Sequence, residues 1–391
     1  MAADLSRLRQ TLLALLEASP AAVAPLTRQE WDELDRIAAL HRLQPMLHHR
    51  HRDNSAIPAE IRVEWQVGFR RGAAESLIIG AELAQAAALL EGAGLAPIAL
   101  KGAWLAWHAY PHPALRPMRD IDLLLAPDTV VAGFELLLEH GYRLDGPLEL
   151  SLDDIIRLDK HMPPLLSPRG VTIELHHRLW EIDGRMDHAA PADDEGAIRA
   201  RAIRTGTLAY LAPQDLLAHL IIHAIYDHRL DCGPLVLSDV SNLLHCSEID
   251  WERFWADAAA GHWQRGAQLV LTLVRAHDPA APVMIPAGLP KVPSDFERLA
   301  ADLLLQELET RRSAGVVATF AAGGVKSLIL RIFARRGGGG DTHTVQRDLN
   351  DEGGFATWAG SRLTRTLREL ARGDVRRQSV ALARLSRWLD A

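Results

Sequence analysis

The sequence has few cysteines and no long apolar run. Its 391 residues include two cysteines, Cys232 and Cys246, which are too few for a disulfide framework. We therefore expect buried thiols in a reducing cytoplasm. The residues after Met1 lack the charged segment and the cleavable apolar core of a secretion signal. No stretch approaches about eighteen uncharged apolar residues, so we expect no membrane span.

The sequence also lacks a strong excess of charge. A formal net charge of −7 argues against a protein that coats nucleic acid. The tail from Arg311 onward is the exception, because it carries fifteen Lys and Arg against seven Asp and Glu. Nucleic acid is therefore not expected as a partner, except through this basic tail.

Helical periodicity dominates both ends of the chain. With 48% hydrophobic residues, the chain is long enough for two or three domains. Near the N-terminus, apolar residues recur every three to four positions, which predicts helices over 4–18, 28–47 and 61–94. The same spacing predicts later helices over 213–227, 234–246, 250–277 and 295–310, and a last amphipathic stretch over 360–389. The glycine run 337–340 predicts a flexible joint before that stretch.

The middle of the chain changes to strands. A short apolar run bounded by glycine, 96–102, predicts a buried strand, and a helix over 103–109 follows it. RDIDLLLA, 119–126, predicts a second strand, with a helix over 127–142 that begins at a proline. VTIELHH, 171–177, alternates in polarity and predicts a third strand. The order of strand, helix, strand and helix is that of an α/β unit.

Two aspartates open the second predicted strand. Residues two apart on a strand point to the same side, so Asp120 and Asp122 project together. Carboxylates held so close repel each other unless a cation lies between them. Their oxygens suit Mg²⁺ or Mn²⁺, and two such ions about 3.5–4 Å apart bind the attacking and leaving oxygens of a nucleotidyl transfer. The third strand puts Thr172, Glu174 and His176 on one face, where Glu174 can supply a third carboxylate.

Basic residues and a glycine surround these acids. Lys101 and Gly102 close the preceding strand, where glycine lets the backbone approach phosphates and lysine neutralises them. Arg116 and Arg119 precede the aspartates, and either balance their charge or hold a phosphate. Together these residues fit a triphosphate.

Other polar clusters have competing interpretations. His219, His223 and Asp227 fall at four-residue steps on one helix face, a spacing that can bind metal. The segment HLIIH lacks the glutamate of a zinc-protease H-E-x-x-H motif, so a helix that lines the cleft, or plain packing, is the preferred interpretation. A basic cluster at a helix end is expected to be solvated and consists of His48, His49 and His51.

The order of these motifs is typical of one family. The motifs are LKGAWLAWHAYPHPALRPMRDIDLLLAPD (100–128), IELHHRLW (173–180), LAPQDLLAHLIIHAIYDH (211–228), LSDVSNLL (237–244) and IDWERFWADA (249–258). Over roughly 85–275 the chain resembles the uncharacterised nucleotidyltransferase family of bacteria, a branch of the DNA polymerase beta-like nucleotidyltransferase superfamily. Its members read approximately L-K-G-x-x-L, then Y-P-x-x-x-x-R-P-x-x-D-I-D-L-L-V, and later V-E-x-H-W.

The resemblance implies a fold and an activity. The expected fold class is α+β, a small mixed-sheet nucleotidyltransferase core flanked by helical regions at both ends. Asp120, Asp122 and Glu174 would be the catalytic residues and the ligands of Mg²⁺ or Mn²⁺, and the reaction would move a nucleoside monophosphate from an NTP, such as ATP. The expected division is an N-terminal helical domain 1–84, a catalytic core 85–190, a helical C-terminal domain 191–310 and a basic helical tail 311–391.

Two other functions stay open at the level of sequence. Glycosyltransferases also use an aspartate pair to hold Mn²⁺ on a nucleotide-sugar, but they normally have about a hundred residues of parallel α/β structure before it, where this chain has helices. A non-catalytic NTP-binding protein could retain the same fold. The sequence does not name the acceptor, which could be a small molecule, a peptide, a protein or a nucleic-acid end.

Overall fold

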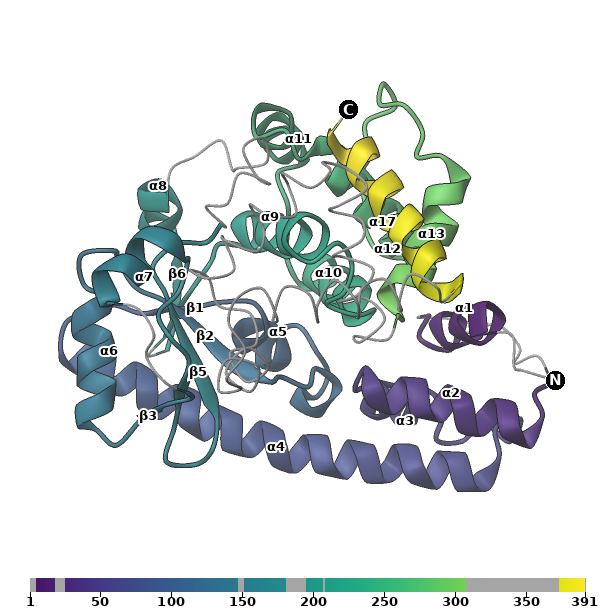
Figure 1. Cartoon of the computed structure of the whole chain (residues 1–391), viewed down its shortest axis with the longest axis horizontal. Helices are drawn as coiled ribbons and strands as arrows, with labels where there is room; N and C mark the ends of the chain where they lie inside the picture. The colour runs from purple at the N-terminus through teal and green to yellow at the C-terminus, as the bar shows by residue number, and fades with distance from the viewer. Residues whose placement is uncertain are drawn as a thin grey trace, which may run out of the picture.

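The computed structural model describes residues 5–17, 25–146, 151–180, 195–206, 208–306 and 373–390. Figure 1 shows a sheet on one side of the molecule, a long helix beneath it and a group of C-terminal helices beside it. The mixed sheet and its many helices confirm the predicted α+β class. The predicted glycine joint at 337–340 lies outside the described residues.

The N-terminal part is helical, as predicted. Its helices are α1 (Leu5–Leu15), α2 (Arg28–Leu40), α3 (Gln44–His51) and α4 (Ala59–Gly92). Thr27 and Glu30 begin α2 with a reciprocal capping box. The single helix predicted over 28–47 is instead two helices, because the chain turns at Arg42, whose φ is +55°. No glycine or proline marks this turn in the sequence, so the apolar periodicity alone could not predict where α2 ends.

Seven strands form one mixed sheet in the order β3-β4-β5-β2-β1-β7-β6. They are β1 (Ile98–Ala99), β2 (Asp120–Leu124), β3 (Arg143–Leu144), β4 (Leu165–Leu166), β5 (Thr172–His176), β6 (Ile203–Thr205) and β7 (Leu208–Tyr210). β2 is parallel to β5 and antiparallel to β1, which is parallel to β7. The predicted strands are the three central ones. The other four have two or three residues each, too few for alternation to be recognised.

The two faces of the sheet differ in chemistry. The shorter helices around it are α5 (Gly102–His108), α6 (Val130–Glu139), α7 (Leu152–Leu158) and α8 (Glu195–Ala200), with a 3₁₀ turn η1 (Pro113–Leu115). Leu90 of α4 and Phe134 of α6 share a buried cluster with Ile121, Leu123 and Ile173 of the sheet. That face is therefore apolar, and the alternate residues of β2 and β5 point to the other face.

The C-terminal part is a second group of helices. They are α9 (Pro213–Ile222), a π-helical turn η2 (His223–Asp227), α10 (Leu235–Cys246), α11 (Trp251–Ala260), α12 (Gln264–His277), α13 (Ser294–Leu304) and α17 (Gly373–Asp390). The continuous helix predicted over 250–277 is broken between α11 and α12, where His262 has a φ of +59°. The last predicted stretch is described only in its final part, as α17.

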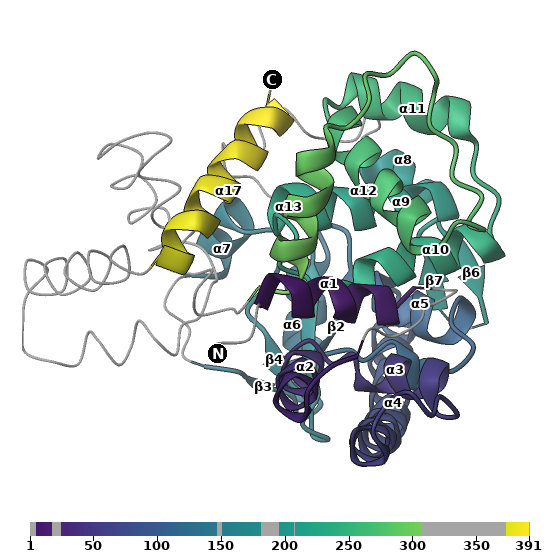
Figure 2. The ribbon, with the colours of Figure 1, turned by 90° about the vertical axis from the view of Figure 1, so that its right-hand side faces the viewer.

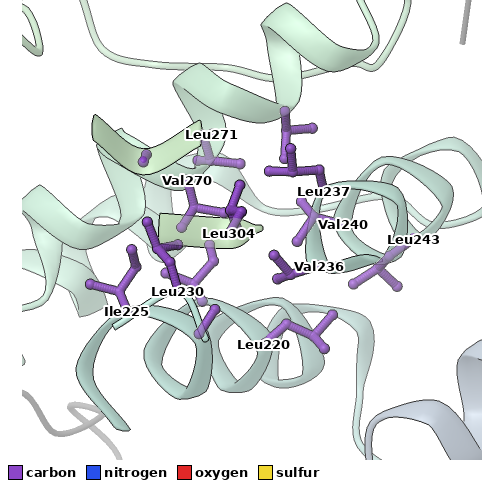
Figure 3. Packing of buried hydrophobic residues seen from close by; sticks show 14 of the residues in the cluster. Leu220, Ile225, Leu230, Val236, Leu237, Val240, Leu243, Val270, Leu271 and Leu304 are labelled. Atoms are coloured by element: carbon purple, nitrogen blue, oxygen red, sulfur yellow. The ribbon is translucent and has the colours of Figure 1, made fainter. Parts of the chain in front are cut away.

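Helices from the two ends of the chain share one core. Figure 3 shows apolar side chains of α9, α10, α12 and α13 packed together, among them Leu220, Val240 and Leu304. Leu12 of α1 and Leu385 of α17 belong to the same buried cluster. In Figure 2, α17 lies alongside α13, which in turn packs on α1. The division into four domains stays a prediction.

Two smaller expectations need correction, and a third concerns a membrane span. Cys232 and Cys246 are free thiols, as expected, but both are exposed rather than buried. His51 does not belong to a solvated cluster, because it is buried and its Nε2 lies 2.8 Å from the carbonyl oxygen of Leu15. By length and composition, one described helix, α4, could cross a membrane, a test that core helices of soluble proteins also pass. Acidic residues such as Glu75 and Glu82 interrupt this helix, so it does not contradict the expectation that no stretch approaches eighteen uncharged apolar residues.

Candidate active site

Strands β2 and β5 place the acidic residues side by side. They pair in parallel register, with Asp122 opposite Glu174 and Asp120 opposite Thr172. Directly opposed residues on neighbouring strands share a face, so the three acids lie on the same side of the sheet. The intervening Ile121 is fully buried on the other side. The alternation predicted from the sequence is therefore the one observed.

A group of possible metal ligands forms around this pair. One ligand atom each from Asp122, Glu174 and His176 lies within 4.8 Å of the others, although the structure contains no ion. His176 Nε2 is 2.9 Å from Asp122 Oδ1 and 3.5 Å from Glu174 Oε2. A second imidazole, His161, has its Nε2 3.9 Å from Glu174 Oε2. Asp120 lies near enough for its charge to interact with those of Asp122 and Glu174.

Lys101 contacts the same acids from the end of β1. Its Nζ lies 3.1 Å from Asp122 Oδ2, and both side chains are largely shielded from solvent. The neighbouring N–H of Leu100 donates to the Asp122 carbonyl oxygen at 3.0 Å, which extends the pairing of β1 with β2. Lys101 itself has φ +46° and ψ −116°, a conformation that side-chain-bearing residues rarely adopt. Such strained residues occur most often at functional sites.

The two cations keep Asp122 ionised. Burial would raise the pKa of Asp122, but the charge of Lys101 and the hydrogen bond from His176 outweigh it and hold that pKa well below its usual value. Conversely, burial would lower the pKa of His176, and its hydrogen bonds to Asp122 and Glu174 raise it instead. Asp122 is therefore in contact with both the ammonium of Lys101 and the imidazole of His176.

Asp120 and Glu174 are in different electrostatic states. Burial, together with the charges of Asp122 and Glu174, raises the pKa of Asp120 to about 6. For Glu174, burial acts in the same direction, but the hydrogen bond from His176 and the charge of His161 lower its pKa. Asp120 is thus the acid with the weakest compensation, and a divalent cation would relieve its repulsion.

The other residues predicted to bind phosphate, Gly102, Arg116 and Arg119, have different surroundings in the structure. A Cβ at Gly102 would lie 2.8 Å from Met118 Sδ, so the glycine makes room for that side chain. Arg116 Nε donates to both carboxylate oxygens of Asp239 in α10, at 2.8 and 3.0 Å. Arg119 is exposed, and it forms no ion pair with these acids within the described part of the chain. The position of Arg116 indicates a tether between the sheet and the C-terminal helices.

The helix α9 and the turn η2 line the opposite side of the site. The charges of Lys101, His176 and Asp122 all act on His219, which places this histidine near them. His223 stacks on His219 with the rings 6.0 Å apart and nearly parallel. Lys160, which precedes β4, has its Nζ 3.2 Å from Asp227 Oδ2. The interpretation of this helix as a wall of the cleft is therefore preferred.

The metal interpretation of this helix is not supported. Within the described part of the chain, a single group of three possible metal ligands is found, and it is the one on β2 and β5. His223 Nδ1 instead lies 3.3 Å from Asp227 Oδ2, four residues later.

Sequence reasoning missed three residues of the site. His176 shares the face of Glu174 two residues away, so the strand alternation already indicated its position but not its role. Asp239 carries no local signal, because its partner Arg116 is 123 residues away in the chain. His161 lies on a segment without a recognisable pattern and reaches the site through a β-bridge to His176.

The comparisons with known proteins agree with this geometry. A sequence model for an uncharacterised nucleotidyltransferase matches residues 27–277, which is more than half of the chain. The chain belongs to this uncharacterised nucleotidyltransferase family. No curated protein and no solved structure gives a significant match. The matched segment of the chain includes the sheet, the acidic cluster and the helices α9, α10 and α12.

The ligand set of this site suits a divalent cation. Carboxylate oxygens are the preferred ligands of Mg²⁺, and an added imidazole nitrogen is compatible with Mn²⁺. Asp122, Glu174 and His176 provide both atom types within one cluster. The residues present therefore fit a metal of this class.

Proposed function

We propose that the protein is a metal-dependent nucleotidyltransferase of the DNA polymerase beta-like superfamily, from a bacterial branch. It would move a nucleoside monophosphate from an NTP, with ATP as the first candidate, to a hydroxyl or phosphate of an acceptor. The observation that carries the proposal is the in-register pair of Asp122 and Glu174, with Asp120 on the same face of β2. Family membership over residues 27–277 supports the same conclusion.

The reaction exchanges the phosphoanhydride bond between the α- and β-phosphates of the NTP for a bond between the α-phosphorus and the acceptor oxygen. The acceptor oxygen attacks the α-phosphorus, a new P–O bond forms, and the bond to the β-phosphate breaks. Diphosphate leaves with the bonding electron pair, and the acceptor proton is released to solvent. Bound at Asp120, Asp122 and Glu174, Mg²⁺ or Mn²⁺ would supply positive charge to the phosphate oxygens and lower the pKa of the acceptor hydroxyl.

The protein's own residues would position the substrates. Asp122 and Glu174 fix the ligand geometry because both lie on central strands whose other faces are buried. A cation that binds Asp122 competes with Lys101 for the same carboxylate, and the released ammonium is then available to the triphosphate. Arg116 would act at a distance, by holding α10 against the loop that precedes β2.

The two alternative functions predict different substrates. A glycosyltransferase would require an α/β nucleotide-binding region before the aspartates, and the chain has the helices α1 to α4 there. A non-catalytic NTP-binding protein would bind nucleotide without turnover. Purified protein incubated with α-labelled NTPs, with UDP-sugars and with a host-cell extract separates the three possibilities by the mass of the product. Transfer from UDP-sugars alone contradicts the proposal, as does nucleotide binding without any transfer.

The remaining expectations concern location and partners. A cytoplasmic location is proposed from the two free thiols. The NTP is the proposed partner, together with an acceptor that could be a small molecule, a peptide or a protein. Contact with nucleic acid is proposed only for the basic tail, most of which lies outside the described residues.

A further inference from the structure

The long helix α4 leaves one of its faces exposed. In Figures 1 and 2 it lies at the edge of the molecule, with the other described helices on one side of it. Its buried side chains, such as Trp65 and Leu90, belong to the two hydrophobic clusters of the fold. On the outer side, Leu77 is 77% exposed, more than any other large apolar side chain among the described residues.

The exposed side chains of α4 follow the repeat of a coiled coil. From Val63 to Ala88, alternate steps of four and three residues reach an exposed side chain each time. All of these residues are valine, alanine or leucine except Arg70. Such steps average 3.5 residues, a repeat that keeps one apolar stripe facing a partner helix over many turns. The stripe is exposed in the single chain, so the repeat indicates a helix of another molecule.

A groove adjoins the middle of this stripe. It has a cavity volume of about 500 Å³. Leu77, Gly80 and Ala84 of α4 line one side of it, and Trp107 of α5 and Tyr210 of β7 line the other. The same surface therefore carries a protruding leucine and an apolar hollow next to it. This combination is what an interface with two-fold symmetry requires, because the same patch must fit itself.

The charges along α4 favour two antiparallel copies. Arg70 and Arg71 are exposed, and they form no ion pair within the described part of the chain. Parallel copies would place each arginine against its own counterpart, and like charges repel. In an antiparallel pair centred one turn after Leu77, both arginines come within about one turn of Glu91 of the second copy, at the helix end where the dipole favours cations. Within its own chain Glu91 contacts Arg204, a half-exposed side chain at the surface.

The size of the face indicates the strength of the contact. The stripe from Val63 to Ala88 is about 38 Å long and about 11 Å wide, which gives a footprint of about 400 Å² per copy. A standard protein interface buries about 800 Å² per partner. The walls of the groove on α5 and β7 therefore have to supply much of the remainder. We expect a dimer of moderate strength, with a dissociation constant of about 1–100 μM.

We propose that the exposed face of α4 and the adjoining groove bind a second copy of this chain, as an antiparallel dimer in which Leu77 of each copy enters the groove of the other. A lipid bilayer is the other occupant that an exposed apolar helix could have. The stripe fits a bilayer less well, because its alanines offer lipid little apolar area and Arg70 interrupts it. The acidic cluster lies on the face of the sheet away from α4, so the dimer leaves the candidate active site open.

Sedimentation velocity of the full-length protein tests the association. Between about 1 and 200 μM, the wild type should change from monomer to dimer, and Leu77→Glu should raise the dissociation constant at least about tenfold. The matched control is Met284→Glu, which places the same charge at another exposed apolar residue and should dimerise normally. Circular dichroism of both variants checks that they fold. A wild type that stays monomeric throughout this range, or a folded Leu77→Glu variant that dimerises normally, overturns the inference.

Cross-linking tests the orientation, and decides alone if Leu77→Glu does not fold. Cys232→Ser and Cys246→Ser remove the two native thiols, and either Ala81→Cys or Val63→Cys then adds one for a short bismaleimide. In the antiparallel dimer the two Ala81 positions lie about 10 Å apart and should cross-link, whereas the two Val63 positions lie about 50 Å apart and should not. Cross-linking at both positions, or at neither, overturns the proposal. Flotation of a monomeric protein with phosphatidylglycerol vesicles would assign the face to a bilayer instead.

Discussion

The Nζ of Lys101 lies 3.1 Å from Oδ2 of Asp122, so a residue expected to meet a triphosphate is bound to a metal-site carboxylate in the protein alone. His176 lies 2.9 Å from the other oxygen of Asp122, so both oxygens of this carboxylate already have protein partners. A metal ion bound at the proposed site would therefore have to displace Lys101 from Asp122. We therefore expect neutralisation of Asp120 and neutralisation of Asp122 to change the stability of the metal-free fold in opposite directions.

The metal-free protein should respond oppositely to the two isosteric changes. Asp122→Asn removes the partner of Lys101 and His176 and should destabilise the fold by about 3 kcal/mol. The folded pKa of Asp120, about 6, is above its ordinary value of 3.8, so the stability it contributes below pH 3.8 is lost as pH rises through 6. Asp120→Asn should therefore stabilise by about 1–3 kcal/mol at pH 7. Urea unfolding in EDTA measures both, and equal signs would contradict the assignment.

Glu174 should matter more for turnover than for nucleotide binding. Glu174→Gln keeps the shape of the side chain and removes its charge next to the acceptor side of the site. Transfer should slow at least about tenfold, equivalent to about 1.4 kcal/mol of barrier. Equilibrium binding of ATP with Mn²⁺ should fall much less, because Asp120 and Asp122 remain. Equal losses in ATP binding and in turnover would contradict a specific role of Glu174 in the transfer step.

Two substitutions at Lys101 separate its charge from its backbone conformation. Both Lys101→Ala and Lys101→Gly remove the ammonium and should weaken ATP binding by about 1–3 kcal/mol. Glycine accepts φ +46° and ψ −116° without strain, so the Gly variant should be the more stable by about 1 kcal/mol. Isothermal titration and thermal melting measure the two effects. An alanine variant that is more stable than the glycine variant is incompatible with a strained Lys101.

Arg116 and Asp239 should behave as a buried pair. Arg116→Met leaves Asp239 buried, with Tyr110 at 2.7 Å as its one remaining side-chain donor among the described residues, and should destabilise by about 3–5 kcal/mol. The double change Arg116→Met with Asp239→Leu removes both charges and should cost much less than the sum of the two single changes. Urea unfolding of the four proteins gives the coupling energy. Additive effects would mean that this tether contributes nothing.

Buried histidines should make the fold sensitive to mild acid. Burial lowers the pKa of His41 and of His277 to about 4, below the ordinary 6.5 of an unfolded histidine. Their contribution is fully present above pH 6.5 and is lost as pH falls from there toward 4, by about 1.4 kcal/mol per pH unit for each residue. His277→Gln should flatten this dependence between pH 6.5 and 5, whereas the exposed His140→Gln should leave it unchanged. Chemical denaturation across this range is the measurement.

Local pattern was sufficient to predict that Asp120, Asp122 and Glu174 lie on one face of the sheet. The alternation in β5 and the pair of acids in β2 are properties of a few consecutive residues, and a strand places such residues predictably. These two strands also pair directly, which brought Asp122 opposite Glu174. The α+β fold class could also be predicted, because segments with strand-like and with helical periodicity are clearly separated along the sequence.

Features that depend on distant partners or on unusual backbone were not predictable. The helix breaks at Arg42 and His262 occur at non-glycine residues with positive φ, so no breaker marks them in the sequence. The contact between Arg116 and Asp239 requires the docking of α10 against the sheet. Paired acids were expected to repel each other in the absence of metal, and the structure supplies Lys101 and His176 as counter-charges that the acids themselves do not reveal.

The π-helical turn η2 determines the direction in which its last side chains point relative to those of α9. Because each residue advances an α-helix by about 100°, the extra residue in a wide turn shifts everything after it by nearly a third of a revolution. Deletion of Ala224 would let the helix close normally and would swing Asp227 away from the ammonium of Lys160. His219, which precedes the turn, would keep its place. The angle between the side chains of His219 and Asp227 around the helix axis therefore depends on a single additional residue in the turn.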